Sequence, residues 1–157
     1  GELRPDGPGM ISLRNDLVRM AARSRKVVAI ITSDEHSYSR TLITPETPAG
    51  DPARDDRDGD GMLDSAPLSV IPGLSRPIWV IISGGGGAPN YAEERSPWNE
   101  WWKAHPEMCP TKDGCYRFSM LYHWLLFDAE ENAIGLEVYT DRGDLIDRVE
   151  DLAAVGR

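Results

Sequence analysis

The sequence predicts an α+β fold of the α/β sandwich type, with one helix and a mixed sheet that ends in an antiparallel meander. The helix is indicated by apolar positions that recur at helical spacing after Ser12, a suitable N-cap: Leu13, Leu17, Met20, Ala21 and Ser24. Six apolar or β-branched residues at 27–32 then form a strand that should be covered on both faces. The meander is indicated by strand-like segments at 118–128, 133–140 and 145–149, joined by polar turns.

The remaining segments divide the chain into three parts within a single domain or domain fragment, 1–157. A helix–strand unit occupies 12–42, an insertion rich in Pro, Gly and Asp occupies 44–75, and 76–157 holds a further strand, a glycine run and the meander. Residues 91–114 look irregular, and their tryptophans are expected to anchor this loop on the core more often than to form a binding surface: Trp98, Trp101 and Trp102. The packed face of the meander is expected to contain Trp124, Leu126, Leu136 and Val138.

Composition excludes several classes of partner. A chain of 157 residues with 40% hydrophobic residues can bury the core of one domain. Its net charge of −9 argues against a nucleic-acid or anionic-membrane binder, because both surfaces attract basic proteins. No apolar stretch approaches the roughly 20 residues that a membrane-spanning helix needs.

Two cysteines, Cys109 and Cys115, flank a segment whose Asp-Gly pair favours a turn. A disulfide between them would suit a periplasmic or secreted protein, whereas two free thiols are the alternative. No signal peptide is visible in the sequence, and because it starts at Gly1 rather than Met, a signal peptide is expected to lie outside it.

The acidic segment 56–64 has the spacing of a calcium loop. Carboxylates at positions 1, 3 and 5, a glycine at position 6, a carbonyl at position 7 and an oxygen at position 9 can surround Ca²⁺. Here these ligands are Asp56, Asp58, Asp60, the Met62 carbonyl and Asp64. Pro67 replaces the final EF-hand glutamate, so the segment resembles the loops of thrombospondin type 3 repeats and dockerins. A solvated acidic loop is the alternative.

The strand at 27–32 runs directly into Asp34-Glu35-His36, and imidazole and carboxylate groups both bind divalent metals. The segment Ser-Asp-Glu-His-Ser-Tyr-Ser-Arg at 33–40 resembles the last metal-binding motif of calcineurin-like metallophosphoesterases, the superfamily of the purple acid phosphatases. The match lies on His36, Tyr38 and Arg40, and a second match is the strand that leads into Gly84–Gly87.

This resemblance implies the C-terminal portion of a four-layer phosphoesterase that hydrolyses phosphate esters with a water activated by two divalent metals, either Fe, Mn or Zn. His36 would bind one metal, and Asp34, which replaces the family's first histidine, would bind the other. Arg40 would contact the phosphate or instead pair with a local carboxylate. The earlier family motifs are missing except for a chance spacing at 143–147, so most ligands must come from a missing N-terminal half or a companion chain, and the isolated chain should be inactive.

A second hypothesis belongs to a different class. The chain would be a non-catalytic, calcium-stabilised binding or structural module that keeps a phosphoesterase-like skeleton. The glycine run at 84–87 either cradles a phosphate or forms a tight turn beside the metal site, which is the expected case. His123, within an apolar strand, is expected to be a core histidine whose hydrogen bonds are satisfied.

Overall fold

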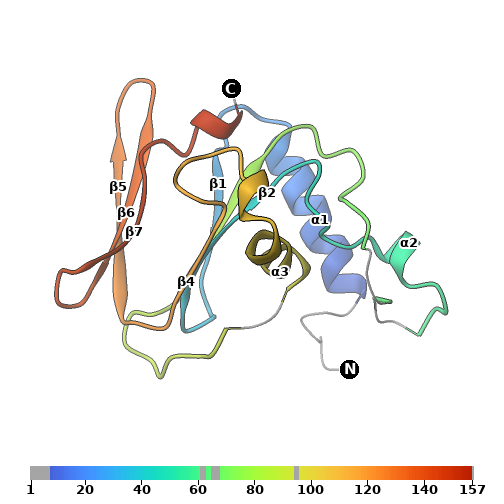
Figure 1. The fold of residues 1–157 in the computed structure, drawn as a ribbon, viewed down its shortest axis with the longest axis horizontal. Coiled ribbons are helices and arrows are strands. Elements are labelled where there is room, and N and C mark those ends of the chain that lie inside the picture. The colour runs from blue at the N-terminus through green and yellow to red at the C-terminus, as the bar shows by residue number, and fades with distance from the viewer. Residues whose placement is uncertain (1–7, 61–62, 65–67, 94–95, 157) are drawn as a thin grey trace.

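The structure, a computed structural model, describes residues 8–60, 63–64, 68–93 and 96–156. Figure 1 shows an antiparallel sheet on one side, a mixed sheet in the middle, and helices on the other side. The antiparallel sheet has the order β5 (His123–Ala129), β6 (Ile134–Thr140), β7 (Leu145–Val149). The α+β class and the C-terminal meander are therefore confirmed.

The mixed sheet has the order β1-β3-β2-β4. Its strands are β1 (Ala29–Thr32), β2 (Tyr38–Ile43), β3 (Ile78–Ser83) and β4 (Tyr116–Ser119). β1 pairs with β3 in parallel, whereas β2 pairs with β3 and β4 in antiparallel register. Because β3 lies between β1 and β2, the connection 33–37 must cross over the carboxyl end of β3.

Two apolar clusters lie on opposite faces of the mixed sheet. One joins it to the antiparallel sheet through Leu42, Trp79, Ile81, Leu136 and Val138. The other joins it to helix α1 (Pro8–Ala22) through residues that include Val18, Ala22, Ile43 and Ile78. The alternation of side chains along β3 produces both clusters, because Ile78 faces the helix while Trp79 and Ile81 face the second sheet.

The helices differ from the prediction in two ways. α1 begins at Pro8, so Ser12 lies inside the helix and is not its N-cap. A helix α3 (Pro97–Ala104) occupies part of the segment that was expected to be irregular; Ser96 caps it by accepting a hydrogen bond from Asn99 N. The expected anchoring role of the tryptophans is confirmed for Trp102, which is 5% exposed and donates to Leu42 O at 2.7 Å.

The first predicted strand is not covered on both faces. β1 forms an edge of the mixed sheet, and Ile31 is 53% exposed. The continuous apolar sequence at 27–32 therefore indicated a strand correctly but not its place in the sheet.

The predicted strand 118–128 is divided between the two sheets. Residues up to Ser119 belong to β4 and those from His123 belong to β5. Leu136 and Val138 are buried as expected, but Trp124 and Leu126 are 48% and 45% exposed. Their assignment to the packed face is wrong, because Leu125 is the β5 residue that packs against the apolar cluster between the sheets.

The insertion 44–75 contains little regular structure among its described residues. It holds the short helix α2 (Pro52–Asp55) and an isolated bridge between Pro48 and Val70. Single 3₁₀ turns lie at Pro106–Met108 and Ala154–Gly156. Across the part of the chain that the structure describes, no helix has the length and apolarity needed to cross a membrane.

Candidate functional site

The loop that carries His36 lies against the glycine run, as expected. Gly84 N donates to Ser37 O at 3.1 Å, where loop 33–37 crosses the end of β3. A Cβ at Gly84 would collide with the carbonyl oxygen of Glu35, so only glycine permits this approach of two backbones. The glycine run therefore forms the turn that brings the two segments of the phosphoesterase resemblance together.

His36 is oriented by the chain that follows these glycines. Its Nδ1 lies 2.8 Å from Pro89 O, and its ring stacks on Tyr91 with 4.3 Å between the centroids. Because a carbonyl only accepts hydrogen bonds, the neutral ring in this contact carries its proton on Nδ1 and its lone pair on Nε2, and no described residue bonds to Nε2. This arrangement is common for metal-binding histidines, which usually donate their other N–H to a carbonyl or carboxylate.

Asp34 lies two residues before His36, at the exposed tip of the crossing loop. Its backbone has φ of 87°, in the left-handed region that aspartate enters more readily than most residues. Across the described residues, no group of three converging His, Cys, Asp or Glu ligands includes Asp34 or His36. These two residues by themselves do not complete a metal site.

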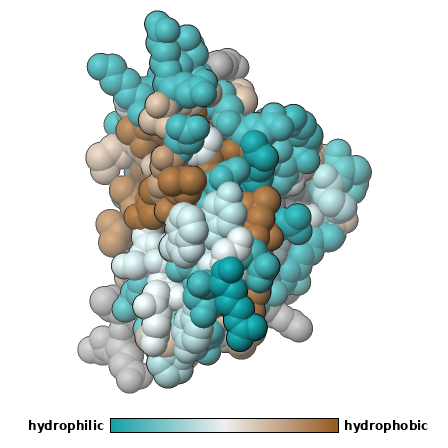
Figure 2. Space-filling model, turned by 90° about the vertical axis from the view of Figure 1, so that its left-hand side faces the viewer, coloured by the Kyte–Doolittle hydropathy of each residue, from teal (hydrophilic) through white to brown (hydrophobic). Residues whose placement is uncertain are grey.

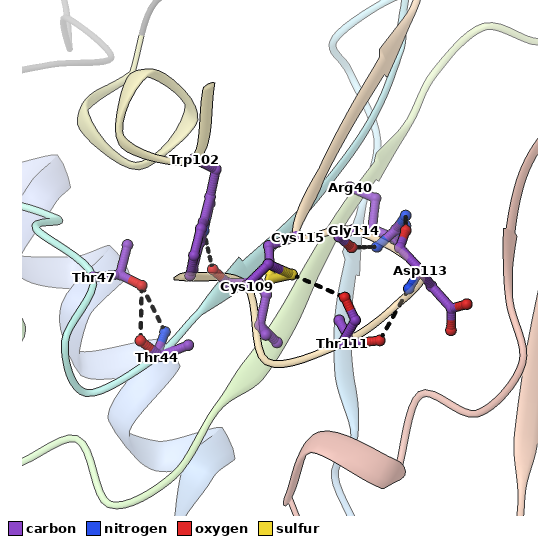
Figure 3. Close-up of a disulfide and its surroundings, with 10 residues drawn as sticks. Arg40, Thr44, Thr47, Trp102, Cys109, Thr111, Asp113, Gly114 and Cys115 are labelled. Atoms are coloured by element: carbon purple, nitrogen blue, oxygen red, sulfur yellow. Dashed lines mark hydrogen bonds between the residues drawn. A yellow bond between two sulfur atoms is a disulfide. The ribbon is translucent and has the colours of Figure 1, made fainter. Parts of the chain in front are cut away.

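Arg40 lies in the core, where protein groups bind its guanidinium. Its side chain is fully buried, and its Nε and Nη2 bind both oxygens of Asp147 at 2.6 and 3.0 Å. Nη1 and Nη2 also donate to Gly114 O and Asp113 O (Figure 3). The alternative reading, an arginine paired with a carboxylate, is the one the structure supports.

The same carboxylate also binds Tyr38, the aromatic residue of the motif. The Tyr38 hydroxyl donates to Asp147 Oδ2 at 2.6 Å, and burial, followed by the Asp147 charge, raises the pKa of Tyr38 above its usual value. Tyr38 and Arg40 thus join the two sheets and do not face a substrate. Asp147 belongs to segment 143–147, whose match to a metal motif is attributed to chance in the sequence. No local feature of the sequence identifies Asp147 as the partner of Arg40.

His123 is a core histidine, as expected. It is 7% exposed, its Nδ1 contacts Leu121 O at 2.9 Å, and its Nε2 contacts Ser83 Oγ at 3.1 Å. A Cβ at Gly85 would overlap the His123 ring, so the second glycine of the run has a packing role. Both ring nitrogens are satisfied, which leaves no free ligand atom.

The acidic loop brings three of its predicted ligands together. Carboxylate oxygens of Asp56, Asp58 and Asp60 all lie within 4.8 Å of one another. Asp56 Oδ1 is buried and has no hydrogen-bond partner, which is costly for a carboxylate oxygen unless a cation neutralises it. This donor set of hard oxygen atoms fits Ca²⁺.

Asp64, another predicted calcium ligand, is not part of this group. Asp64 accepts a hydrogen bond from Arg57 N at 2.7 Å, and this bond joins the two ends of segment 56–64. Met62 lies outside the described residues. The structure therefore assembles the first three ligand positions and uses Asp64 to fold the loop.

Cys109 and Cys115 form a disulfide, with their Cα atoms 5.5 Å apart (Figure 3). The turn between them carries Asp113 and Gly114, whose carbonyls bind Arg40. The bridge thus holds two of the acceptors that surround the buried guanidinium. A disulfide of this kind fits an extracytoplasmic protein.

Comparison of the chain with protein-family models, with curated proteins and with solved structures finds no match.

Proposed function

We propose that this chain is the C-terminal portion of a metal-dependent phosphoesterase and that it does not hydrolyse phosphate esters by itself. The observation that carries the proposal is His36, whose Nδ1 lies 2.8 Å from Pro89 O while no described residue bonds to its Nε2. His36 would bind one divalent metal and Asp34 the other, and the remaining ligands would come from a further polypeptide portion. In the complete enzyme the two metals would activate a water for attack on the phosphorus.

Two surfaces support the idea that a further portion is needed. Trp124 and Leu126 of β5 are exposed. Figure 2 views the molecule from the side of the antiparallel sheet, and apolar residues gather there among polar ones. A fourth layer, as in a metallophosphoesterase-like fold, would cover this face. At the other sheet, β1 is an edge strand with Ile31 exposed, so its outer backbone groups are available for pairing.

The test uses Mn²⁺, which broadens nuclear magnetic resonance signals close to its binding site. We expect selective broadening around His36 and Pro89 that is lost in His36→Ala and kept in His105→Ala, a histidine on a different surface segment. The isolated chain should show no hydrolysis of 4-nitrophenyl phosphate or its diester.

Two results would contradict the proposal. Broadening that is identical in the wild type and in His36→Ala would remove the ligand role of His36. Hydrolysis by the isolated chain that His36→Ala abolishes would show that the catalytic site is complete without further ligands.

A second candidate function is a calcium-stabilised, non-catalytic module. The observation in its favour is the convergence of Asp56, Asp58 and Asp60 around a carboxylate oxygen with no partner. Calcium in this loop would have a structural role, because it would neutralise neighbouring carboxylates that otherwise repel one another. The two functions are compatible in one chain; they differ in whether His36 binds a metal.

A further inference from the structure

A cavity of about 770 Å³ lies between α1, α3 and the helix-facing side of the mixed sheet. Its floor contains Ser37, Ser39 and Val80, and its walls include Ile11 of α1 and Trp98 of α3. The volume is within the range of roughly 300 to 1,000 Å³ that small-molecule sites occupy. The buried face of a sheet beneath helices is normally apolar, so the hydroxyl side chains on this floor need an explanation.

Two of these hydroxyls lack a partner within the described chain. Ser37 and Ser39 are 6% and 9% exposed, and neither side chain forms a hydrogen bond to a described residue. Thr41, the next residue on the same face of β2, instead donates to Asn99 Oδ1 at 2.9 Å. Buried hydroxyls without protein partners at a cavity surface are available to donate to a bound molecule.

The cavity is also lined by Arg14, a partly buried cation that contacts no carboxylate among the described residues. The Arg14 guanidinium binds Asn15 Oδ1 at 2.8 Å and Ala49 O, and its Cζ lies 4.0 Å from the centroid of Trp98. None of its contacts with described residues is to a carboxylate, and burial lowers the pKa of Arg14 to about 9. A buried charge of this kind is costly unless an opposite charge approaches it.

The cavity wall also holds three carboxylates, those of Glu35, Asp64 and Glu93, and none of them pairs with Arg14 among the described contacts. Glu93 forms an ion pair with Lys103 and accepts a hydrogen bond from the Tyr116 hydroxyl. Asp64 accepts the hydrogen bond from Arg57 N that closes the acidic loop. Arg40, by contrast, is buried with its carboxylate in place.

We infer that this cavity binds a small organic anion with an apolar body and a carboxylate head. The carboxylate would accept hydrogen bonds from Arg14 and from the hydroxyls of Ser37 and Ser39. Its apolar body would lie against Ile11, Val80, Ile82 and Phe118, which line the same space. His36 is not among the described residues that line the cavity, so this inference does not depend on metal binding by His36.

The experiment measures binding of the fluorescent sulfonate 1-anilinonaphthalene-8-sulfonate, which combines an aromatic body with an oxyanion. We expect one site, displaced by decanoate, and an affinity that falls about ten-fold in Arg14→Met, because a charge-assisted hydrogen bond is lost. Ser39→Leu, which places a larger side chain in the cavity, should abolish binding. Trp124→Ser on the exposed sheet face is the matched control and should leave binding unchanged.

Each remaining outcome decides the inference. Displacement by decyl phosphate in preference to decanoate would overturn the carboxylate assignment. If Arg14→Met and Ser39→Leu bind the dye as tightly as the wild type does, the dye does not occupy the cavity and the proposal is wrong. The same holds if only Trp124→Ser loses binding, because the dye then lies on the exposed sheet. If Arg14→Met does not fold, the pair Ser37→Ala and Ser39→Ala gives the same test, since both changes are small and should lower the affinity together.

Discussion

At the scale of single residues, the functional reading of the sequence depends on which partners each side chain finds. Arg40 and His36 belong to the same motif, yet Arg40 is paired with Asp147, whereas Nε2 of His36 has no partner among the described residues. The sequence left both possibilities open for Arg40, because its partner lies 107 residues away. No local pattern contains that contact, whereas the strand-end position of His36 was visible in the sequence.

The first prediction concerns this buried ion pair. The side chains of Arg40 and Asp147 are 0% and 3% exposed, so Asp147→Asn leaves an uncompensated guanidinium in the core. We expect the free energy of unfolding in urea to fall by about 3 to 5 kcal/mol. Arg117, whose side chain is 62% exposed, also lies 3.7 Å from Asp147.

Arg117→Ala provides the control for the same carboxylate. It should lower the free energy of unfolding by less than about 1 kcal/mol, because the Arg117 side chain is exposed to solvent. Equal losses in the two variants would show that burial does not determine the strength of the Arg40 pair.

At the scale of elements, periodic and apolar patterns were sufficient for α1, β1, β3 and the meander, but not for their surroundings. An apolar run such as 27–32 can form either a central strand or an edge strand. The exposure of Ile31 could therefore be known only once the pairing of the strands was known. Helix α3 was missed although Ser96 and Pro97 form a recognisable helix start. The irregular composition of 91–114 concealed a short helix held by tertiary contacts of Trp102.

The second prediction concerns Asp55, which fastens the insertion. Burial alone would raise the pKa of Asp55, but hydrogen bonds from Asp51 N, Ser69 N and Ser69 Oγ lower it below its usual value of 3.8. A lowered pKa in the folded state means that the carboxylate stabilises the fold above about pH 4 and loses this effect as pH falls through the folded value.

We therefore expect Asp55→Asn to destabilise the protein at pH 6 and to differ less from the wild type at pH 2. Urea unfolding at both pH values measures this difference. Asp141→Asn, in an exposed turn, should follow the wild type throughout. If the difference in the free energy of unfolding between Asp55→Asn and the wild type is the same at both pH values, the pKa of Asp55 is not lowered in the folded state.

At the scale of the whole molecule, the chain combines its own core with uncovered surfaces. Two apolar clusters stabilise both faces of the mixed sheet, while the exposed residues of β5 and the edge at β1 remain open. A core of this kind favours independent folding, and the open surfaces favour a further layer. A metal that bound the acidic loop only in the folded state would stabilise the whole chain.

The last prediction tests this linkage. A ligand that binds only the folded state raises the free energy of unfolding by about 2.7 kcal/mol when its concentration is one hundred times its Kd. For a chain of this size, calcium at that level should raise Tm by roughly 5 to 10 °C in a calorimetric scan. Asp58→Asn keeps an acceptor for Asp60 N but removes one charged ligand, so it should lose most of the calcium effect and little stability in chelator. Asp141→Asn should respond to calcium as the wild type does. If calcium shifts Tm equally in Asp58→Asn and in the wild type, the convergence of Asp56, Asp58 and Asp60 is not a calcium site, and the structural-module function loses its support.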